Sequence, residues 1–75
     1  MNYNEKLNSY IGKAGCLSEP IKEEPFYSFT VGKGVFNPYH VIAEVGYDYV
    51  VVQAKKEARS FTAIPLTLFV LIVLH

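Results

Sequence analysis

The segment Leu66-Thr-Leu-Phe-Val-Leu-Ile-Val-Leu74 has eight apolar residues in nine and carries no charge. As a helix it would extend about 14 Å, half the hydrocarbon core of a bilayer, so it is too short to cross one. Its β-branched residues favour a strand, and a strand this apolar must be covered on both faces. We expect one face to fill the protein interior, namely Leu68, Val70 and Ile72. We expect the other face to lie outside, namely Phe69, Leu71 and Val73.

The preceding residues, 26–65, alternate β-branched and aromatic runs with turn residues. Such runs, about ten residues apart, indicate successive strands joined by tight turns. Gly32-Lys33-Gly34 and Gly46-Tyr47-Asp48 are the expected turns, and residues 55–58 form a polar reversal. Pro65 has no N–H for a sheet ladder and should end the last of these strands. The strands are expected at 26–31, 40–45, 49–54 and 59–64.

The N-terminal third of the chain has a different pattern. Apolar residues recur at spacings of three and four from Tyr3 to Ala14, which predicts an amphipathic helix over residues 2–14. Residues 16–25 contain two prolines and several charges, and we expect them to be a linker. Because the chain has 75 residues and half are hydrophobic, we expect one domain, residues 1–75, with its β part at 26–75.

Four or five short strands without crossover helices predict a mainly β protein of the α+β type. The expected architecture is a small antiparallel barrel or a strongly bent sheet, with the short N-terminal helix over one face or opening. The run Val31-Gly-Lys-Gly-Val-Phe-Asn-Pro-Tyr39, followed by Val50-Val-Val52 and Arg59-Ser-Phe61, resembles SH3-like and Tudor-like small barrels over residues 30–70. The chain departs from that pattern at Tyr39-His40-Val41, where such domains usually have glycines. The resemblance implies a recognition module, although a fold alone does not fix a function.

The sequence contains no residues at a catalytic or metal-binding spacing. Cys16 has no neighbouring base and is expected to be a small, inert residue. His40 and His75 lack the further ligands that zinc requires. Glu23 and Glu24 are adjacent in the expected linker and lack the enclosed cleft of a catalytic carboxylate pair. We therefore expect no enzymatic activity, no cofactor and no metal ion.

The charge balance and the cysteine content indicate which partners and which cellular compartment to expect. Seven basic and seven acidic residues give a formal net charge of zero, which removes the usual attraction to nucleic acid and leaves self-association unopposed. The single cysteine cannot form an intramolecular disulfide, and the polar N-terminus lacks the apolar run of a secretory signal. We expect a cytoplasmic location.

The first functional hypothesis is a non-catalytic protein-binding module or small protein inhibitor. Tyrosine offers a large contact area at low entropic cost and is enriched in interface hot spots. The tyrosines at expected turns and strand ends either contact a partner or cap a small core. The partner is expected to be another protein, a second copy of the chain or both, and an origin in a phage or mobile element is part of the hypothesis. The predicted contact residues are Tyr27, Tyr39, Tyr47, Tyr49, Phe69, Leu71 and Val73.

Two alternatives remain open. The first is a nucleic-acid-binding barrel in which basic residues contact phosphates while Tyr47 and Tyr49 stack on bases. Its basic residues are Lys33, Lys55, Lys56 and Arg59. The zero net charge makes nucleic acid the less favoured partner. The second alternative is a membrane-peripheral protein anchored by residues 66–74 as a short helix at the surface of the bilayer.

Overall fold

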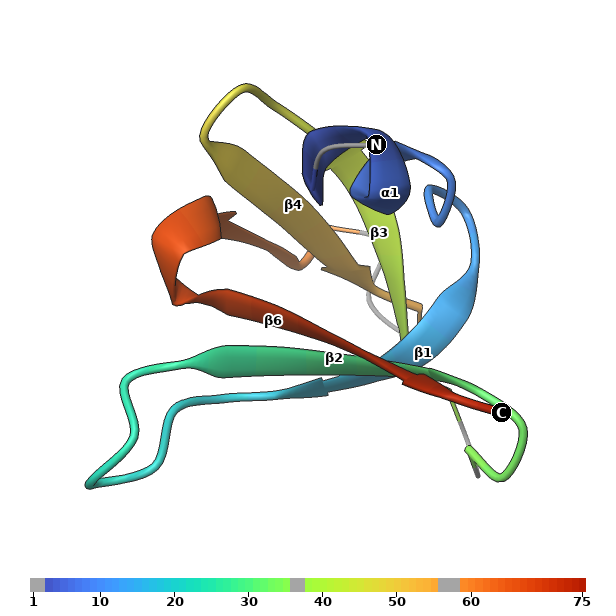
Figure 1. The fold of residues 1–75 in the computed structure, drawn as a ribbon, viewed down its shortest axis with the longest axis horizontal. Coiled ribbons are helices and arrows are strands. Elements are labelled where there is room, and N and C mark those ends of the chain that lie inside the picture. The colour runs from blue at the N-terminus through green and yellow to red at the C-terminus, as the bar shows by residue number, and fades with distance from the viewer. Residues whose placement is uncertain (1–2, 36–37, 56–58) are drawn as a thin grey trace.

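The computed structural model describes residues 3–35, 38–55 and 59–75, and Figure 1 shows how their elements are arranged. The elements in these ranges are α1 (Tyr3–Asn8), β1 (Ala14–Ser18), β2 (Tyr27–Gly32), β3 (His40–Val45), β4 (Tyr49–Ala54), β5 (Phe61–Pro65), the 3₁₀ helix η1 (Leu66–Leu68) and β6 (Phe69–Leu74). The described part of the chain is therefore mainly β with one short N-terminal helix, as predicted.

The six described strands form one open, mixed sheet in the order β5-β4-β3-β1-β2-β6. Neighbouring strands are antiparallel except β2 and β6, which are parallel from Tyr27↔Phe69 to Gly32↔Leu74. The predicted antiparallel SH3-like barrel of four or five strands is therefore wrong. A tight hairpin joins only antiparallel neighbours. β6 therefore does not pair with β5, which precedes it in the chain, and it lies at the opposite edge of the sheet, beside β2.

The sheet bends strongly, because β5 and β6 are its two edges and only the three residues of η1 separate them in the chain. Figure 1 shows the resulting curl, in which β6 and β2 lie opposite β3 and β4. The bend occurs in β1, where Ala14 and Gly15 pair with β3 while the following residues pair with β2. A side chain on Gly15 would approach the Thr30 carbonyl oxygen to 2.5 Å, so glycine is required at this bend.

The hydrophobic core lies inside the curl. Every strand except β1 contributes a buried apolar side chain, and α1 adds one more. The rings of Phe29 and Phe69 stack across the β2–β6 pair with their centroids 6.4 Å apart. The buried residues are Leu7, Phe29, Val31, Ile42, Val50, Val52, Ile64 and Phe69. Burial of these side chains from both halves of the sheet stabilises the bend.

The N-terminal helix is shorter than predicted, because α1 ends at Asn8 and not at residue 14. Gly12 adopts a φ of +87°, and its N–H donates to the Ile42 carbonyl oxygen at 3.0 Å. Ile11 forms a bridge with the same residue of β3. These bonds to β3 replace those of a continued helix, while Tyr10 still packs against the core from the turn. Tertiary pairing thus overrides the helical spacing.

The predicted linker at 16–25 is also wrong, since its first three residues belong to β1. The remaining residues form the loop of the β1–β2 hairpin, which projects from the body of the protein in Figure 1. At its tip the Glu24 N–H donates to the Ile21 carbonyl oxygen at 3.0 Å, closing a turn. Pro20 and Pro25 flank this turn and cannot donate to a sheet ladder, which keeps the loop outside the sheet.

The chain reversals that glycine and proline predict lie where they were expected. The Gly46 N–H donates to the Tyr49 carbonyl oxygen at 2.8 Å and closes the β3–β4 hairpin. β5 ends at Pro65. Gly32 and Gly34 have φ angles of +113° and +88°, which glycine adopts readily in a turn.

Candidate functional site

β6 lies at an edge of the sheet, and its two faces are the reverse of the prediction. Its inward-facing residues, which pack in or against the core, are Phe69, Leu71 and Val73. Its outward-facing residues, here called the outer row, have exposed fractions of 40% for Val70, 39% for Ile72 and 41% for Leu74. Of the residues expected to fill the interior, Val70 and Ile72 therefore lie outside, and Leu68 is half-buried in η1.

The register with β2 explains this orientation. Phe69 lies beside Tyr27 and Leu71 lies beside Phe29, whose side chain is fully buried. Because neighbours in register project to the same face of a sheet, Leu71 must point inward and Ile72 outward. In the sequence both alternating sets of β6 are apolar, so alternation alone could not distinguish the two faces.

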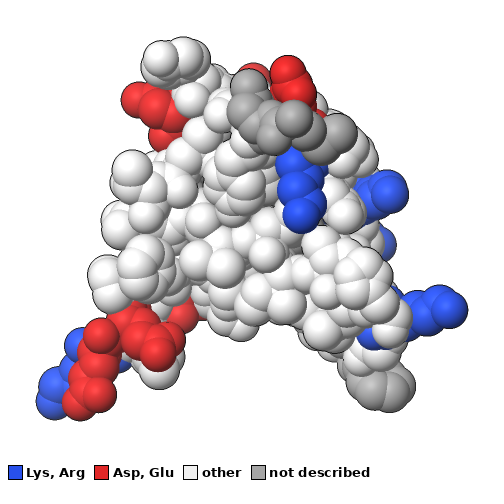
Figure 2. Space-filling model, viewed as in Figure 1, with Lys and Arg blue, Asp and Glu red and all other residues white. Residues whose placement is uncertain are grey.

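The outer row lies on a surface without charged neighbours. The parallel register places Ser28 beside Val70, Thr30 beside Ile72 and Gly32 beside Leu74. Figure 2 shows that the charged residues visible in this view lie mainly around its margins, leaving the region over β2 and β6 uncharged. The surface around the outer row therefore consists of small, neutral side chains that neither cover it nor repel a neutral partner.

The backbone of β6 also has an unpaired edge. The Leu74 carbonyl oxygen accepts a hydrogen bond from the Lys33 N–H at 3.3 Å, so the polar groups of Leu74 face β2. This direction alternates along a strand, which means that the N–H and C=O groups of Phe69, Leu71 and Val73 point away from β2. Of these, the Phe69 N–H donates to the Leu66 carbonyl oxygen of η1. Among the described strands, only β2 pairs with β6.

Tyr3 of α1 occupies the first part of that edge. Its hydroxyl donates to the Phe69 carbonyl oxygen at 3.1 Å. Burial raises the pKa of Tyr3 above 10.0, and a hydrogen bond from the Leu71 backbone opposes that rise. Only a donor can lower the pKa of a phenol in this way, so the Leu71 N–H is directed at the same hydroxyl oxygen. Tyr3 therefore bonds one acceptor of β6, the Phe69 carbonyl, and lies over the start of the open edge.

Contacts at both ends of α1 hold Tyr3 in this position. The side-chain amide of Asn4 donates to the carbonyl oxygens of Gly46 and Tyr47, at 2.8 and 3.1 Å. Leu7, one turn later, is fully buried in the core. The helix thus connects the β3–β4 turn with β6, and the open part of the β6 edge begins at the Leu71 carbonyl. No pattern in the sequence indicates the bond from Tyr3, because Tyr3 and Phe69 are 66 residues apart.

Replacing Tyr3 by phenylalanine is expected to lower the free energy of unfolding by about 1 kcal/mol at neutral pH. The raised pKa means that the folded state favours the neutral hydroxyl. Its contribution is therefore present below the unfolded pKa of about 10 and is lost as pH rises through the folded pKa. Urea denaturation at pH 7 and pH 11 measures this difference. Tyr47→Phe is the control, because Tyr47 is 94% exposed. A Tyr3→Phe effect that is absent at pH 7, or equal at both pH values, contradicts the bond.

The four tyrosines predicted to bind a partner do not form one surface. Tyr27 is half-buried against the core, and Tyr39 precedes β3. Tyr47 and Tyr49 lie together at the β3–β4 turn, at the other end of that strand. The Tyr49 hydroxyl donates to the Glu44 carboxylate at 2.7 Å, and this bond, with the Glu44 charge, raises the pKa of Tyr49. Only Tyr47 and Tyr49 are brought together.

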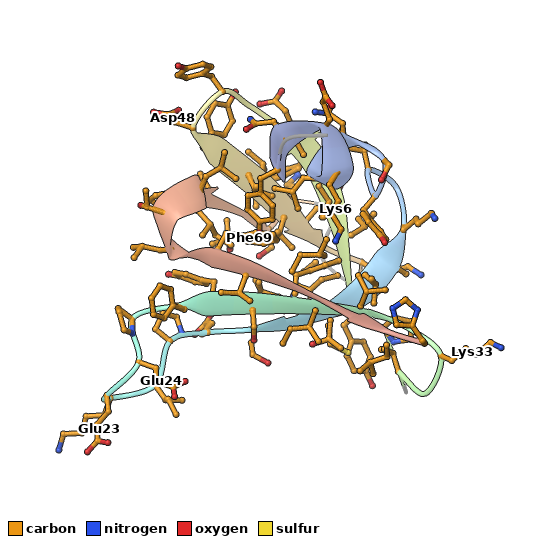
Figure 3. The ribbon with its side chains drawn as sticks, in the orientation of Figure 1. Lys6, Glu23, Glu24, Lys33, Asp48 and Phe69 are labelled. Atoms are coloured by element: carbon orange, nitrogen blue, oxygen red, sulfur yellow. The ribbon has the colours of Figure 1, made fainter. Side chains whose placement is uncertain are left out.

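Of the basic residues of the nucleic-acid alternative, those that the structure describes are separated from Tyr47 and Tyr49. Lys55 follows the end of β4 and Tyr49 begins it, so the length of the strand, about 20 Å, separates them. Lys33 follows β2, and Figure 3 shows it at the periphery of the protein. Arg59 precedes β5, and Lys56 lies outside the described residues. The arrangement does not combine phosphate contacts with those stacking rings.

The described residues show no cluster of metal ligands. In them no group of three or more His, Cys, Asp or Glu side chains could hold a metal ion. His40 accepts a hydrogen bond from the Leu17 N–H at 3.4 Å, which links β3 to β1. Of the helices in the described ranges, none is long and apolar enough to cross a membrane. The anchor helix expected over 66–74 is wrong, since most of that segment is β6.

Comparisons with models of protein families, with curated proteins and with solved structures each found no match. A function must therefore be inferred from the residues of this chain. The feature with the clearest physical consequence is the edge of β6, where open backbone groups and an exposed apolar row occur on one strand.

Proposed function

We propose that this protein is a non-catalytic protein-binding module that contacts its partner through the β6 edge. The observation that supports it is an edge strand with no charge whose outer row is about 40% exposed. Edge strands are usually protected from pairing by a lysine, a proline or a bulge. The sequence of β6, Phe-Val-Leu-Ile-Val-Leu, contains neither lysine nor proline, and its register with β2 is regular over six residues.

The binding mode that fits this strand is the addition of an extended segment to the sheet. Main-chain hydrogen bonds to an open edge provide affinity, and alternate side chains provide specificity. The segment would lie along Leu71 to His75, where Tyr3 does not occupy the edge. Its side chains on the outer face would contact Ile72 and Leu74, which are uncharged and partly exposed.

The opposite edge of the sheet is protected. β5 is five residues long and ends at Pro65, which has no N–H to donate. Its outward-facing residues include Phe61, which is 57% exposed, and the small Ala63 at its centre, while Ile64 is buried. Of the two edges of the described sheet, β5 is the shorter and has a proline, whereas β6 has none. The proposal therefore assigns partner binding to one strand.

Affinity capture from the cells that produce the protein tests the assignment. Ile72→Lys is expected to weaken capture of the partner about tenfold or more, because a lysine on an edge opposes strand pairing. Ala63→Lys, on β5, adds the same charge to the other edge and should capture as the unsubstituted protein does. Circular dichroism checks that both variants fold. Equal capture by all three proteins would refute the proposal.

A further inference from the structure

We propose that the β6 edge binds a second copy of this chain, with the two β6 strands antiparallel across a two-fold axis at Val73. This inference rests on the proposed function, to which it adds the partner and the register. It follows from which backbone groups of β6 remain open, from the side chains beside them and from the protection of the β5 edge.

The open groups of the edge are complementary to themselves. The Phe69 C=O is bonded to Tyr3, and the Leu71 N–H is directed at the same hydroxyl. The next groups that alternation directs outward are the Leu71 C=O and both groups of Val73 and of His75, which are three acceptors and two donors. When Val73 of one copy faces Val73 of the other, each Val73 N–H donates to the opposite Val73 C=O. The same register lets each His75 N–H donate to the opposite Leu71 C=O, so both donors and the Leu71 and Val73 acceptors are bonded, and the His75 C=O faces the opposite Leu71 N–H.

Neighbouring registers leave groups without a partner. If Leu71 faced Val73, the His75 N–H would face the Phe69 C=O, which already accepts a hydrogen bond from the Tyr3 hydroxyl. If Val73 faced His75, the Leu71 carbonyl would remain unpaired. A shift by a single residue would bring the outer row of one copy against the inward-facing side of the other. Because open polar groups at a buried interface are costly, the register centred on Val73 is favoured.

The side chains agree with this register. Residues that flank a hydrogen-bonded pair face each other at the closer, non-hydrogen-bonded position, so Ile72 of each copy faces Leu74 of the other. Four partly exposed apolar side chains would then cover one another. No charged residue lies in β6, and the formal net charge of each copy is zero, so no long-range repulsion opposes the contact.

The same arrangement limits assembly to two copies. A two-fold contact uses the identical strand of each copy and therefore leaves neither β6 edge open. Each copy then has one remaining sheet edge, that of β5, which Pro65 protects at its end. The expected product is a closed dimer with one sheet continuing through both copies, and not a fibre.

Sedimentation equilibrium of the full chain from micromolar to millimolar concentrations measures the dimer, whose mass is twice the 8.5 kDa of one chain. Ile72→Glu and Leu74→Lys, each alone, are expected to raise the dissociation constant about tenfold or more, since each places an unpaired charge in the interface. The two substitutions together should restore the dimer, because opposite charges then face each other across the axis. Ile72→Glu with Leu74→Glu is the matched control and should stay monomeric.

A second measurement does not depend on the variants. Hydrogen exchange of the Val73 amide in the unsubstituted protein should slow as concentration rises, because the proposed bond forms only in the dimer. A mass of 8.5 kDa at every concentration, or concentration-independent exchange at Val73, overturns the dimer. If Ile72→Glu and Leu74→Lys each disrupt the dimer but the two substitutions together do not restore it, the proposed register is wrong. If the chain is monomeric but Ile72→Lys still abolishes partner capture, the proposed function stands and the partner is a different protein. If the chain is monomeric and Ile72→Lys captures the partner as well as the unsubstituted protein does, both proposals are wrong.

Discussion

Phe69→Ala is expected to lower the free energy of unfolding by about 3 to 5 kcal/mol. Phe69 is 4% exposed, and its ring stacks on that of Phe29 with the centroids 6.4 Å apart. Figure 3 shows Phe69 between β6 and the strands on the opposite side of the curl, while the labelled charged residues of the loops lie at the periphery. Truncation would remove apolar burial and leave a cavity where the two halves of the sheet meet. A loss of this size approaches the whole stability of a small domain.

The matched control is Val70→Ala on the same strand. Val70 is 40% exposed and faces outward, so its truncation should cost about 1 kcal/mol or less. Urea denaturation followed by circular dichroism measures both variants, and Phe69→Leu provides a milder change if Phe69→Ala does not fold. A larger loss at Val70 than at Phe69 would show that the faces assigned from the sequence were right and that Phe69 does not point into the core.

Gly32→Ala is expected to cost about 3 kcal/mol or more. Gly32 has a φ of +113°, which residues with a side chain rarely adopt, and a Cβ there would overlap the Leu74 carbonyl oxygen. That carbonyl also accepts the Lys33 N–H. Alanine would therefore both strain the turn and separate the ends of β2 and β6.

Gly34→Ala separates these two effects. Gly34 has a φ of +88°, but no atom lies within 4 Å of the point that a Cβ would occupy there. Its replacement should cost about 1 to 2 kcal/mol, the strain of the backbone alone. Thermal denaturation of both variants gives the comparison. Equal losses would mean that β2 and β6 do not approach closely at Gly32.

Features that depend on a few adjacent residues could be predicted from the sequence. Glycine conformations at Gly32 and Gly34, the hairpin at Gly46 and the strand end at Pro65 all follow from local backbone chemistry. The end of α1 could not, because it is decided by the bond between the Gly12 N–H and the Ile42 carbonyl, 30 residues away. The spacing of apolar residues was right for the buried Leu7 and the half-buried Tyr10, but Tyr3 and Ile11 are exposed, and the spacing did not distinguish a helix from a turn that packs on the sheet.

The candidate site depends on contacts between distant parts of the chain. Alternation in β6 is uninformative, and only the register Phe29↔Leu71 shows that Ile72 faces outward. The parallel pairing itself brings together residues about forty positions apart, for which the sequence has no local signal. Tyr3 was assigned to a helical stripe, which is compatible with its place in α1 but does not predict its bond to Phe69. The sequence thus indicated an important C-terminal strand and left its partner strand and orientation undetermined.

Nuclear Overhauser effects between β2 and β6 in the isolated protein test most directly whether the C-terminal residues form a strand parallel to β2. Backbone contacts in a parallel pattern are expected at Phe29–Leu71 and Val31–Val73, with ring contacts between Phe29 and Phe69. Helical carbon chemical shifts over residues 69–74, or the absence of any contact between this segment and β2, would contradict the structure and remove the basis of the proposed binding edge.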